Sequence, residues 1–369
     1  MKITFVTTTI NIPTLLEGYC EDIASIESDC EIDFIVIGDK KTPADVRDFC
    51  IRLEHRFGLP IQYYDIDDQM KYLRQFPELG QYLPFNSVQR RNIGFVKAYE
   101  QGSDIIISFD DDNYRYQQSI LEGHLSIGQI ETMEIVHSPT GWFDPCIFLR
   151  EKRGIPFCHR GFPRSERWNY GEVRWTVESV KVVVNVGLWV GDPDVDAWMR
   201  MALPLETVAW ERERNFALGP GTWAPFNSQQ TALLREVLPA YFLNPYAGRY
   251  DDIWASYIVH KISNHLGNYV SYGKPIVLHK QERSLESLWR DIDDERMGSI
   301  LNERFIRVLR ETSLTGSTYR ECYVEIGESL ERWAVDGTDL SLEERQYILE
   351  YVRGMRVWQK TFDRLIGYS

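Results

Sequence analysis

Several features that commonly reveal a protein's class are missing from this sequence. No apolar run approaches the roughly 20 residues of a membrane-spanning helix, so we expect no membrane span. The six cysteines form no CxxC pair and no Cys/His spacing that suits zinc. Reduced thiols in a cytoplasmic protein are therefore expected. The chain starts directly with a strand-like pattern and shows no signal-peptide anatomy.

Positive charge is also scarce, since 41 Lys and Arg face 55 Asp and Glu and the net charge is −14. This balance argues against bulk binding to nucleic acid or an anionic membrane. An anionic substrate would need a local basic pocket. The phosphate loop GxxxxGK[ST], the GxSxG elbow and HExxH are all absent, and Gly38 and Gly94 fit no dinucleotide fingerprint.

The first part of the sequence alternates strand-like and helix-like segments. Apolar runs predict strands at residues 3–7, 32–37, 61–64 and 105–109. A helical pattern over residues 88–101 has Ser87 as its cap and Gly102 at its end. We predict an α/β fold, with a mostly parallel sheet flanked by helices. Ligands bind such sheets beyond the carboxyl ends of the strands.

The later sequence predicts functional loops followed by helices. Residues 139–245 are rich in Trp, Pro and Gly and suggest long loops with few strands, notably at 182–186. A helix over 251–266 precedes a strand over 269–278 that Gly-Lys-Pro interrupts. Residues 1–283 then form one domain, and residues 284–369 form a helical extension with a capping box at Ser341. The extension packs on this domain or on another subunit, which would make a homo-oligomer.

An acidic triplet follows the apolar run at 105–109. Residues i and i+2 of a strand point the same way, so Asp110 and Asp112 can face one ion while Asp111 faces elsewhere. Mg²⁺ and Mn²⁺ favour such oxygen ligands, often shared with substrate phosphates. The plain alternative is a solvated acidic turn.

Two groups of arginines could bind an anion. Arg90 and Arg91 begin the helix before the acidic strand and could hold a base or a diphosphate. Solvation at the surface is the plain explanation, at least for one of them. Residues 160–167 carry three arginines in a turn-rich loop, which suggests an anion clamp rather than scattered salt bridges.

Three further residues have both structural and catalytic explanations. Asp251 can act as a helix N-cap, and Asp252 in the first turn is favoured by the helix dipole. Either could also be catalytic. His279 follows an apolar run, as Asp110 does, so it could reach the same mouth of the sheet.

Four motifs in this order resemble the reversibly glycosylated polypeptides, known in plants as UDP-arabinopyranose mutases, which have the glycosyltransferase-A fold. The likeness covers roughly residues 1–285, and it departs from the plant pattern at residues 198–200 and in the helical tail. The motifs are FDDD at 109–112, RGFPRSER at 160–167, GLWV with PDVDA within 187–197, and GRYDDIWA at 248–255.

The resemblance implies a UDP-sugar substrate, Mn²⁺ or Mg²⁺, and interconversion of UDP-arabinopyranose and UDP-arabinofuranose. It also implies reversible self-glycosylation on Arg160 and a need for Arg167. A guanidinium is a poor nucleophile, so a diphosphate clamp is the simpler role for both arginines. We expect metal ligation by Asp110, Asp112 and His279, and catalysis by Arg160, Arg167, Asp251 and Asp252. The expected nucleotide-sugar-binding residues are Thr8, Thr9, Asp39, Arg90, Arg91, Asp111 and Trp189.

Three functions stay open at this point. The first is a metal-dependent UDP-sugar mutase. The second is a glycosyltransferase that moves the sugar to a separate acceptor, with Asp251 or Asp252 as base. The third is a nucleotide-sugar-binding subunit without catalysis.

Overall fold

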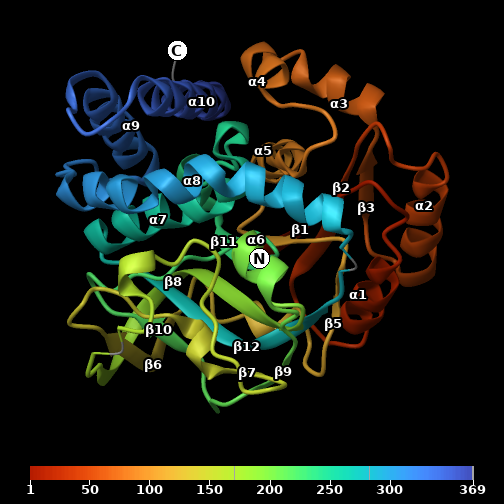
Figure 1. Cartoon of the computed structure of the whole chain (residues 1–369). Helices are drawn as coiled ribbons and strands as arrows, with labels where there is room; N and C mark the ends of the chain where they lie inside the picture. Colours follow the sequence, from red (N-terminus) through yellow and green to blue (C-terminus); the bar gives the residue numbers. More distant parts are fainter. Residues whose placement is uncertain (170, 282, 368–369) are drawn as a thin grey trace.

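A large mixed sheet forms the centre of the protein (Figure 1). The structure is a computed structural model that describes residues 1–169, 171–281 and 283–367. Within these residues the sheet has 12 strands, ordered β3-β2-β1-β4-β11-β8-β6-β10-β12-β5, with β7 and β9 beside this path. The strands are β1 (Lys2–Thr9), β2 (Glu31–Gly38), β3 (Ile61–Tyr64), β4 (Ile105–Phe109), β5 (Asn113–Arg115), β6 (Ile130–His137), β7 (Leu149–Glu151), β8 (Arg174–Gly191), β9 (Thr207–Trp210), β10 (Phe216–Leu218), β11 (Gln230–Leu234) and β12 (Tyr269–His279).

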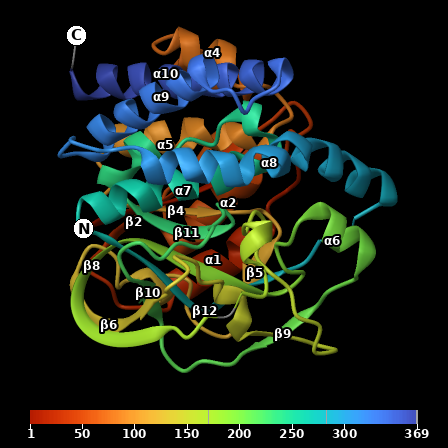
Figure 2. The ribbon, with the colours of Figure 1, turned by 60° about the vertical axis from the view of Figure 1, so that its left-hand side comes forward.

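Helices cover this sheet, and those of the C-terminal region lie opposite β6, β10 and β12 in both views (Figures 1 and 2). The α/β class with a helical C-terminal region is confirmed. The α-helices are α1 (Leu15–Ala24), α2 (Val46–Phe57), α3 (Ile66–Leu73), α4 (Pro77–Tyr82), α5 (Arg91–Glu100), α6 (Ala197–Ala202), α7 (Asp251–His265), α8 (Leu285–Glu311), α9 (Tyr319–Asp336) and α10 (Leu342–Ile366). The 3₁₀ turns are η1 (Val88–Arg90), η2 (Glu122–His124), η3 (Pro145–Phe148), η4 (Arg164–Glu166), η5 (Arg235–Ala240) and η6 (Pro245–Tyr250).

The N-terminal strands pair in parallel, as predicted. β1 lies between β2 and β4, and β3 pairs with the other edge of β2. The Ser87 side chain accepts a hydrogen bond from the Gln89 amide, so the predicted cap is confirmed, and η1 leads into α5. Gly94 lets α5 lie close to β1, because a Cβ there would come within 2.4 Å of Val6 Cγ1. Because β1 pairs in parallel with both β2 and β4, the carboxyl ends of these strands lie at one edge of the sheet.

Beyond β4 most pairings are antiparallel, so the sheet is mixed rather than mostly parallel. β11 pairs antiparallel with both β4 and β8. The predicted strand at 182–186 is the buried middle of β8, which has 18 residues. Residues 182–190 are all buried, whereas most of residues 174–181 are partly or fully exposed, so the apolar run revealed only the buried part of the strand.

β12 carries His279 to the acidic triplet. It runs parallel to β8, with register shifts at Tyr269/Val270 and across the predicted Gly-Lys-Pro interruption, between Gly273 and Val277. At its end His279 pairs with Asn113, the residue after the triplet. His279 therefore does reach the edge of the sheet where β4 ends.

The C-terminal helices pack on the rest of the same chain. The rings of Trp254 and Phe305 stack at 4.1 Å, and those of Trp358 and Phe242 at 4.9 Å. α10 lies beside α4 in both views (Figures 1 and 2), and Lys360 pairs with Glu78 there at 2.9 Å. The Ser284 cap and the Ser341 capping box are both present. A homo-oligomer stays a prediction.

Among the described residues no helix combines the length and apolarity that crossing a bilayer requires.

Candidate functional site

Two adjoining cavities open where β1, β2 and β4 end. The strand-end cavity, about 250 Å³, is lined by the last residues of β1 and β2, by residues that follow β1, β2 and β4, and by the segment that leads into α5. The helix-side cavity, about 460 Å³, extends from Asp110 and Asp112 toward α7 and α8. The two share Asn86, Ser87, Val88, Asp110, Asp112 and Gln281. Their combined extent suits a small-molecule ligand with two parts.

The strand-end cavity collects six of the seven residues predicted to bind a nucleotide sugar. Strand order explains this, because the carboxyl ends of parallel neighbours meet at one edge. Asp39 is held in place by the Ser87 amide, which donates to its Oδ2 at 3.0 Å. The six residues are Thr8, Thr9, Asp39, Arg90, Arg91 and Asp111.

Arg90 and Arg91 are both buried, so surface solvation was the wrong explanation for either. Each is only 1% exposed. Arg90 donates to Gln69 Oε1 at 2.7 Å, lies over the Phe85 ring, and has a lowered pKa because of burial. Arg91 pairs with Asp110 and donates to the Ser228 carbonyl at 2.9 Å. Within the described chain, Nη2 of Arg90 is buried without a hydrogen-bond partner.

The three aspartates of the acidic triplet have different surroundings. Asp110 pairs with Arg91. Asp111 accepts from the Thr9 hydroxyl, and burial together with its two acidic neighbours raises its pKa to about 6. Asp112 Oδ2 lies 3.4 Å from His279 Nε2. Asp110 and Asp112 line both cavities, whereas Asp111 lines only the strand-end cavity.

The metal assignment stays a prediction. Across the described part of the chain, no three His, Cys, Asp or Glu side chains converge as a complete metal site would require. Asp112 and His279 nevertheless fit a partial one. Asp112 Oδ1 and His279 Nε2 are buried, and neither has a hydrogen-bond partner among the described residues. Mg²⁺-type sites often use one or two protein ligands and take the others from substrate phosphates and water.

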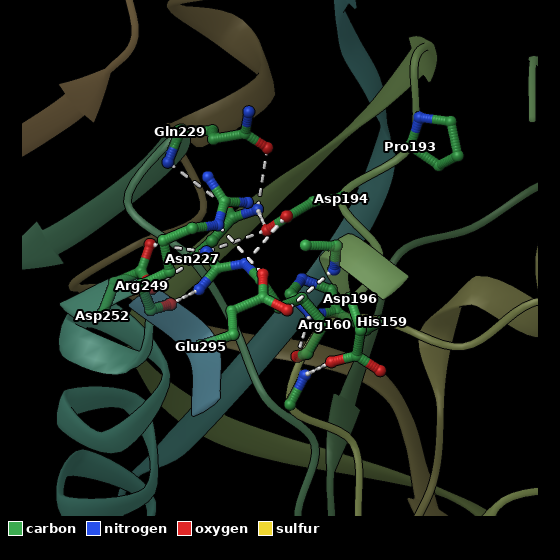
Figure 3. A network of polar contacts seen from close by, with 12 residues as sticks. His159, Arg160, Pro193, Asp194, Asp196, Asn227, Gln229, Arg249, Asp252 and Glu295 are labelled. Carbon is green, nitrogen blue, oxygen red and sulfur yellow. Dashed lines mark hydrogen bonds and ion pairs between the residues drawn. The ribbon is translucent and has the colours of Figure 1, made fainter. Parts of the chain in front are cut away.

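Arg160 is the centre of a buried network of arginines and aspartates (Figure 3). Its Nε lies 2.9 Å from Asp194 Oδ1, and its Nη2 lies 3.0 Å from Asp252 Oδ1. Its Nη1 donates to the Arg249 carbonyl. Burial lowers the pKa of Arg160, but Asp194 and Asp252 raise it further, to well above its ordinary value. The guanidinium lines the helix-side cavity with its charge already matched by protein carboxylates.

Two predicted residues lie outside both cavities. Arg167 pairs with Asp196, donates to the Phe162 carbonyl at 3.1 Å, and does not face the acidic triplet. Trp189 is 3% exposed and packs edge-on against His159 at 5.5 Å. It lies near the C-terminal end of β8, within the buried run at residues 182–190, and is therefore a core residue. The diphosphate clamp that pairs Arg160 with Arg167, and the sugar contact of Trp189, are therefore corrected.

Asp251 and Asp252 open α7 inside the helix-side cavity. Tyr250, rather than Asp251, is the N-cap. Asp251 accepts from Gln89 Nε2 at 2.7 Å, and its pKa is raised by burial and by the Asp252 charge. Asp252 accepts from the Ser228 amide at 3.1 Å in addition to binding Arg160. Both carboxylates are thus fixed in orientation.

Sequence reasoning missed the partners of these residues. The PDVDA motif contains Asp194 and Asp196, and this spacing of carboxylates was the available signal. The other missed residues lie in η6, on α8 or just before α8 in the sequence. They are Arg249, which lies 2.9 Å from Glu295, and the cavity-lining Arg283, Asp291 and Asp294. The division at residues 283 and 284 stays a prediction, but α8 contributes directly to the cavity.

The chain is similar in sequence to several known proteins. The sequence model of the family described as Reversibly glycosylated polypeptide matches residues 52–363. UDP-arabinopyranose mutase 1 of Arabidopsis thaliana is 28% identical over 197 residues, which cover 51% of each chain. Probable UDP-arabinopyranose mutase 1 of Pisum sativum is 23% identical over 276 residues, 70% of this chain and 68% of that protein. The matched part spans about half to two thirds of the length of these relatives.

Among solved structures, the chain weakly resembles two proteins. One is the mannosyltransferase PcManGT of Pyrobaculum calidifontis in complex with GDP-Man and Mn²⁺, with 10% identity and a TM-score of 0.37 over 100% of this chain and 88% of that one. The other is TarS of S. aureus, with 11% identity and a TM-score of 0.38, over 97% of this chain and 50% of that one. At TM-scores this low, neither likeness bears on the ligand or the reaction.

Proposed function

Because the chain belongs to the reversibly glycosylated polypeptide family, we propose that it is a UDP-sugar mutase of the UDP-arabinopyranose/arabinofuranose type. One observation carries the proposal. The acidic triplet, the Arg160 network and the start of α7 meet around two adjoining cavities at the strand ends. A glycosyltransferase-A-like mode of nucleotide-sugar binding and a cytoplasmic location belong to the same proposal.

The strand-end cavity suits the nucleoside. Asp39 can accept a hydrogen bond from a ribose hydroxyl or a base amide. Nη2 of Arg90 is buried without a hydrogen-bond partner in the part of the chain that the structure describes, so it can donate to an acceptor on the ligand. The sugar would then occupy the helix-side cavity, where fixed carboxylates can accept hydrogen bonds from its hydroxyl groups.

Asp112 and His279, with Asp110 beside them, would hold a divalent metal such as Mn²⁺ or Mg²⁺. When bound, such an ion neutralises the diphosphate and makes UDP a better leaving group. Asp110 stays paired with Arg91, and this ion pair holds the end of β4 in place beside the proposed metal site.

Arg160 and Asp252 act on the sugar side. Arg160 holds Asp252 in one orientation, so that this carboxylate faces the cavity and can stabilise positive charge at the anomeric carbon. Its raised pKa opposes loss of a proton, which Arg160 would need in order to become a nucleophile. Self-glycosylation at Arg160 is therefore a separate outcome to be measured.

Transfer to a separate acceptor is the second candidate, and Asp251 favours it. A carboxylate whose pKa is raised toward neutral pH suits removal of a proton from an acceptor hydroxyl. Asp251 lines the helix-side cavity next to Asp252. In this case UDP release would depend on an added acceptor.

Incubation with UDP-arabinopyranose and Mn²⁺, followed by chromatography and intact-mass measurement, tests the proposal. We expect a furanose isomer from the native chain and none from Asp112→Asn. Asp293→Asn on α8 is the matched control and keeps activity, because Asp293 does not line either cavity. A pentose adduct that disappears in Arg160→Lys would show self-glycosylation. UDP binding without any turnover would contradict both enzymatic candidates and favour a binding subunit.

A further inference from the structure

Three arginines line the helix-side cavity, and they differ in how fully their charge is compensated. They are Arg160, Arg249 and Arg283. Arg160 is bound by two carboxylates, and Arg249 by Glu295 at 2.9 Å. Arg283 lies 2.6 Å from Asp291 and 3.8 Å from Asp192.

Both carboxylates near Arg283 are shared with another arginine. Asp192 also pairs with Arg200, and Asp291 also lies 3.7 Å from Arg249. The Arg283 side chain is 13% exposed, and its buried Nε makes no hydrogen bond within the described chain. Burial and the neighbouring charges of Arg200 and Arg249 lower its pKa to about 10. Of the three arginines, Arg283 is the one whose positive charge is least compensated.

The position of Arg283 relates it to the acidic triplet. It follows β12 by four residues, and β12 ends at His279 beside Asp112. Asp110, Asp112 and Arg283 line the same cavity. An anion between β4 and the start of α8 would therefore meet a guanidinium whose Nε lies 3.8 Å from Asp192 and has no hydrogen-bond partner among the described residues.

We propose that Arg283 is the residue that binds the diphosphate of the nucleotide sugar, in place of the Arg160 and Arg167 pair. The inference rests on the proposed function. A guanidinium donates to phosphate oxygens in a fork geometry, and charge-assisted hydrogen bonds of this kind are the strong ones. Asp291 on α8 pairs with Nη1 of Arg283 and competes with the diphosphate for this guanidinium. The helical region thereby takes part in substrate binding.

Calorimetric titration of UDP and of uridine, at one fixed Mn²⁺ concentration, tests this assignment. Arg283→Gln should weaken UDP binding about 10- to 100-fold, because a charge-assisted hydrogen bond is lost. Uridine binding should stay unchanged, which also shows that the variant is folded. Arg296→Gln, an exposed arginine on α8 that pairs with Glu343, is the matched control and should bind UDP as the native chain does.

Asp291→Asn separates binding from a merely structural role. If Arg283 binds the diphosphate, removing its competing carboxylate should preserve UDP affinity or increase it a few-fold. Equal losses of UDP affinity in Arg283→Gln and Asp291→Asn would instead show that the pair only anchors α8, and would overturn the inference. Native-like UDP binding by Arg283→Gln would also overturn it. A native chain that binds no UDP would contradict the proposed function itself.

Discussion

Replacement of Arg160 by Gln tests the buried network directly. The native guanidinium lies within 3.0 Å of both Asp194 and Asp252, and all three side chains are 5–7% exposed. Breaking a buried pair by removing one partner typically costs about 3–5 kcal/mol, because an uncompensated charge stays in the interior. Here one deletion leaves two carboxylates without their shared cation.

The loss of stability expected for Arg160→Gln can be expressed as a decrease in melting temperature, Tm. With about 2.1 cal/mol/K per residue, a chain of 369 residues has an unfolding entropy of about 0.8 kcal/mol/K. A loss of about 3–5 kcal/mol then lowers Tm by about 4–6 °C. Differential scanning calorimetry at pH 7 measures this shift. Arg164→Gln, on the exposed part of the same loop, is the control and should change stability by less than about 0.5 kcal/mol.

A second substitution shows whether charge is the cause. Burial raises the pKa of Asp194, but Arg160 together with His159 and Arg249 lowers it to well below its ordinary range. Asp194→Asn in the Arg160→Gln background removes one of the two stranded charges and should recover part of the lost Tm. A melt of Arg160→Gln within 1 °C of the native chain would refute the reasoning, and so would a double variant that melts no higher than the single one.

Three further predictions concern other parts of the chain. The pKa of Asp251 is raised in the folded chain, so its contribution to the free energy of unfolding is present below about pH 4 and is lost as pH rises through the folded-state pKa. Between pH 5 and 8, Asp251→Asn should therefore lose less stability than the native chain in urea titrations. An unchanged pH slope would contradict this. Gly298→Val should cost about 1–3 kcal/mol in the same assay, since a Cβ on Gly298 would come within 2.4 Å of Tyr250 Cγ; native stability would show that α8 can move away. Trp358→Ala should cost about 3–5 kcal/mol because its ring stacks on Phe242, and a loss below 1 kcal/mol would argue against this packing of α10.

Local patterns predicted the elements that position the site. β3 and β4 have the predicted bounds, and Ser87 and Ser341 cap the helical segments that follow them, as predicted. Each of these signals lies within a few neighbouring residues, in apolar runs or in capping side chains. The alternation of strands and helices predicted that β1, β2 and β4 are parallel neighbours. The residues at the carboxyl ends of these strands were therefore correctly expected to lie together.

Prediction failed where burial depends on distant segments. Trp189 lies in the GLWV motif and was expected to bind the nucleotide sugar, yet it is buried in β8, where it pairs with Val277 of β12. Arg90 and Arg91 are charged and were given a surface alternative, yet partners from Gln69, Asp110 and Ser228 allow their burial. A buried charge is tolerated only with such partners, and sequence spacing does not reveal them.

The sequence by itself determined the α/β class, the acidic end of β4, the meeting of the strand-end residues, and the family. These depend on periodicity, on caps and on contiguous motifs. Only the tertiary structure decided which charges compensate one another. It paired Arg160 with Asp194 and Asp252, turned Arg167 toward Asp196, and brought Arg283 and α8 to the cavity. The physical reason is that Coulomb energy depends on distance and burial in three dimensions, and these partners are up to 92 residues apart in the sequence.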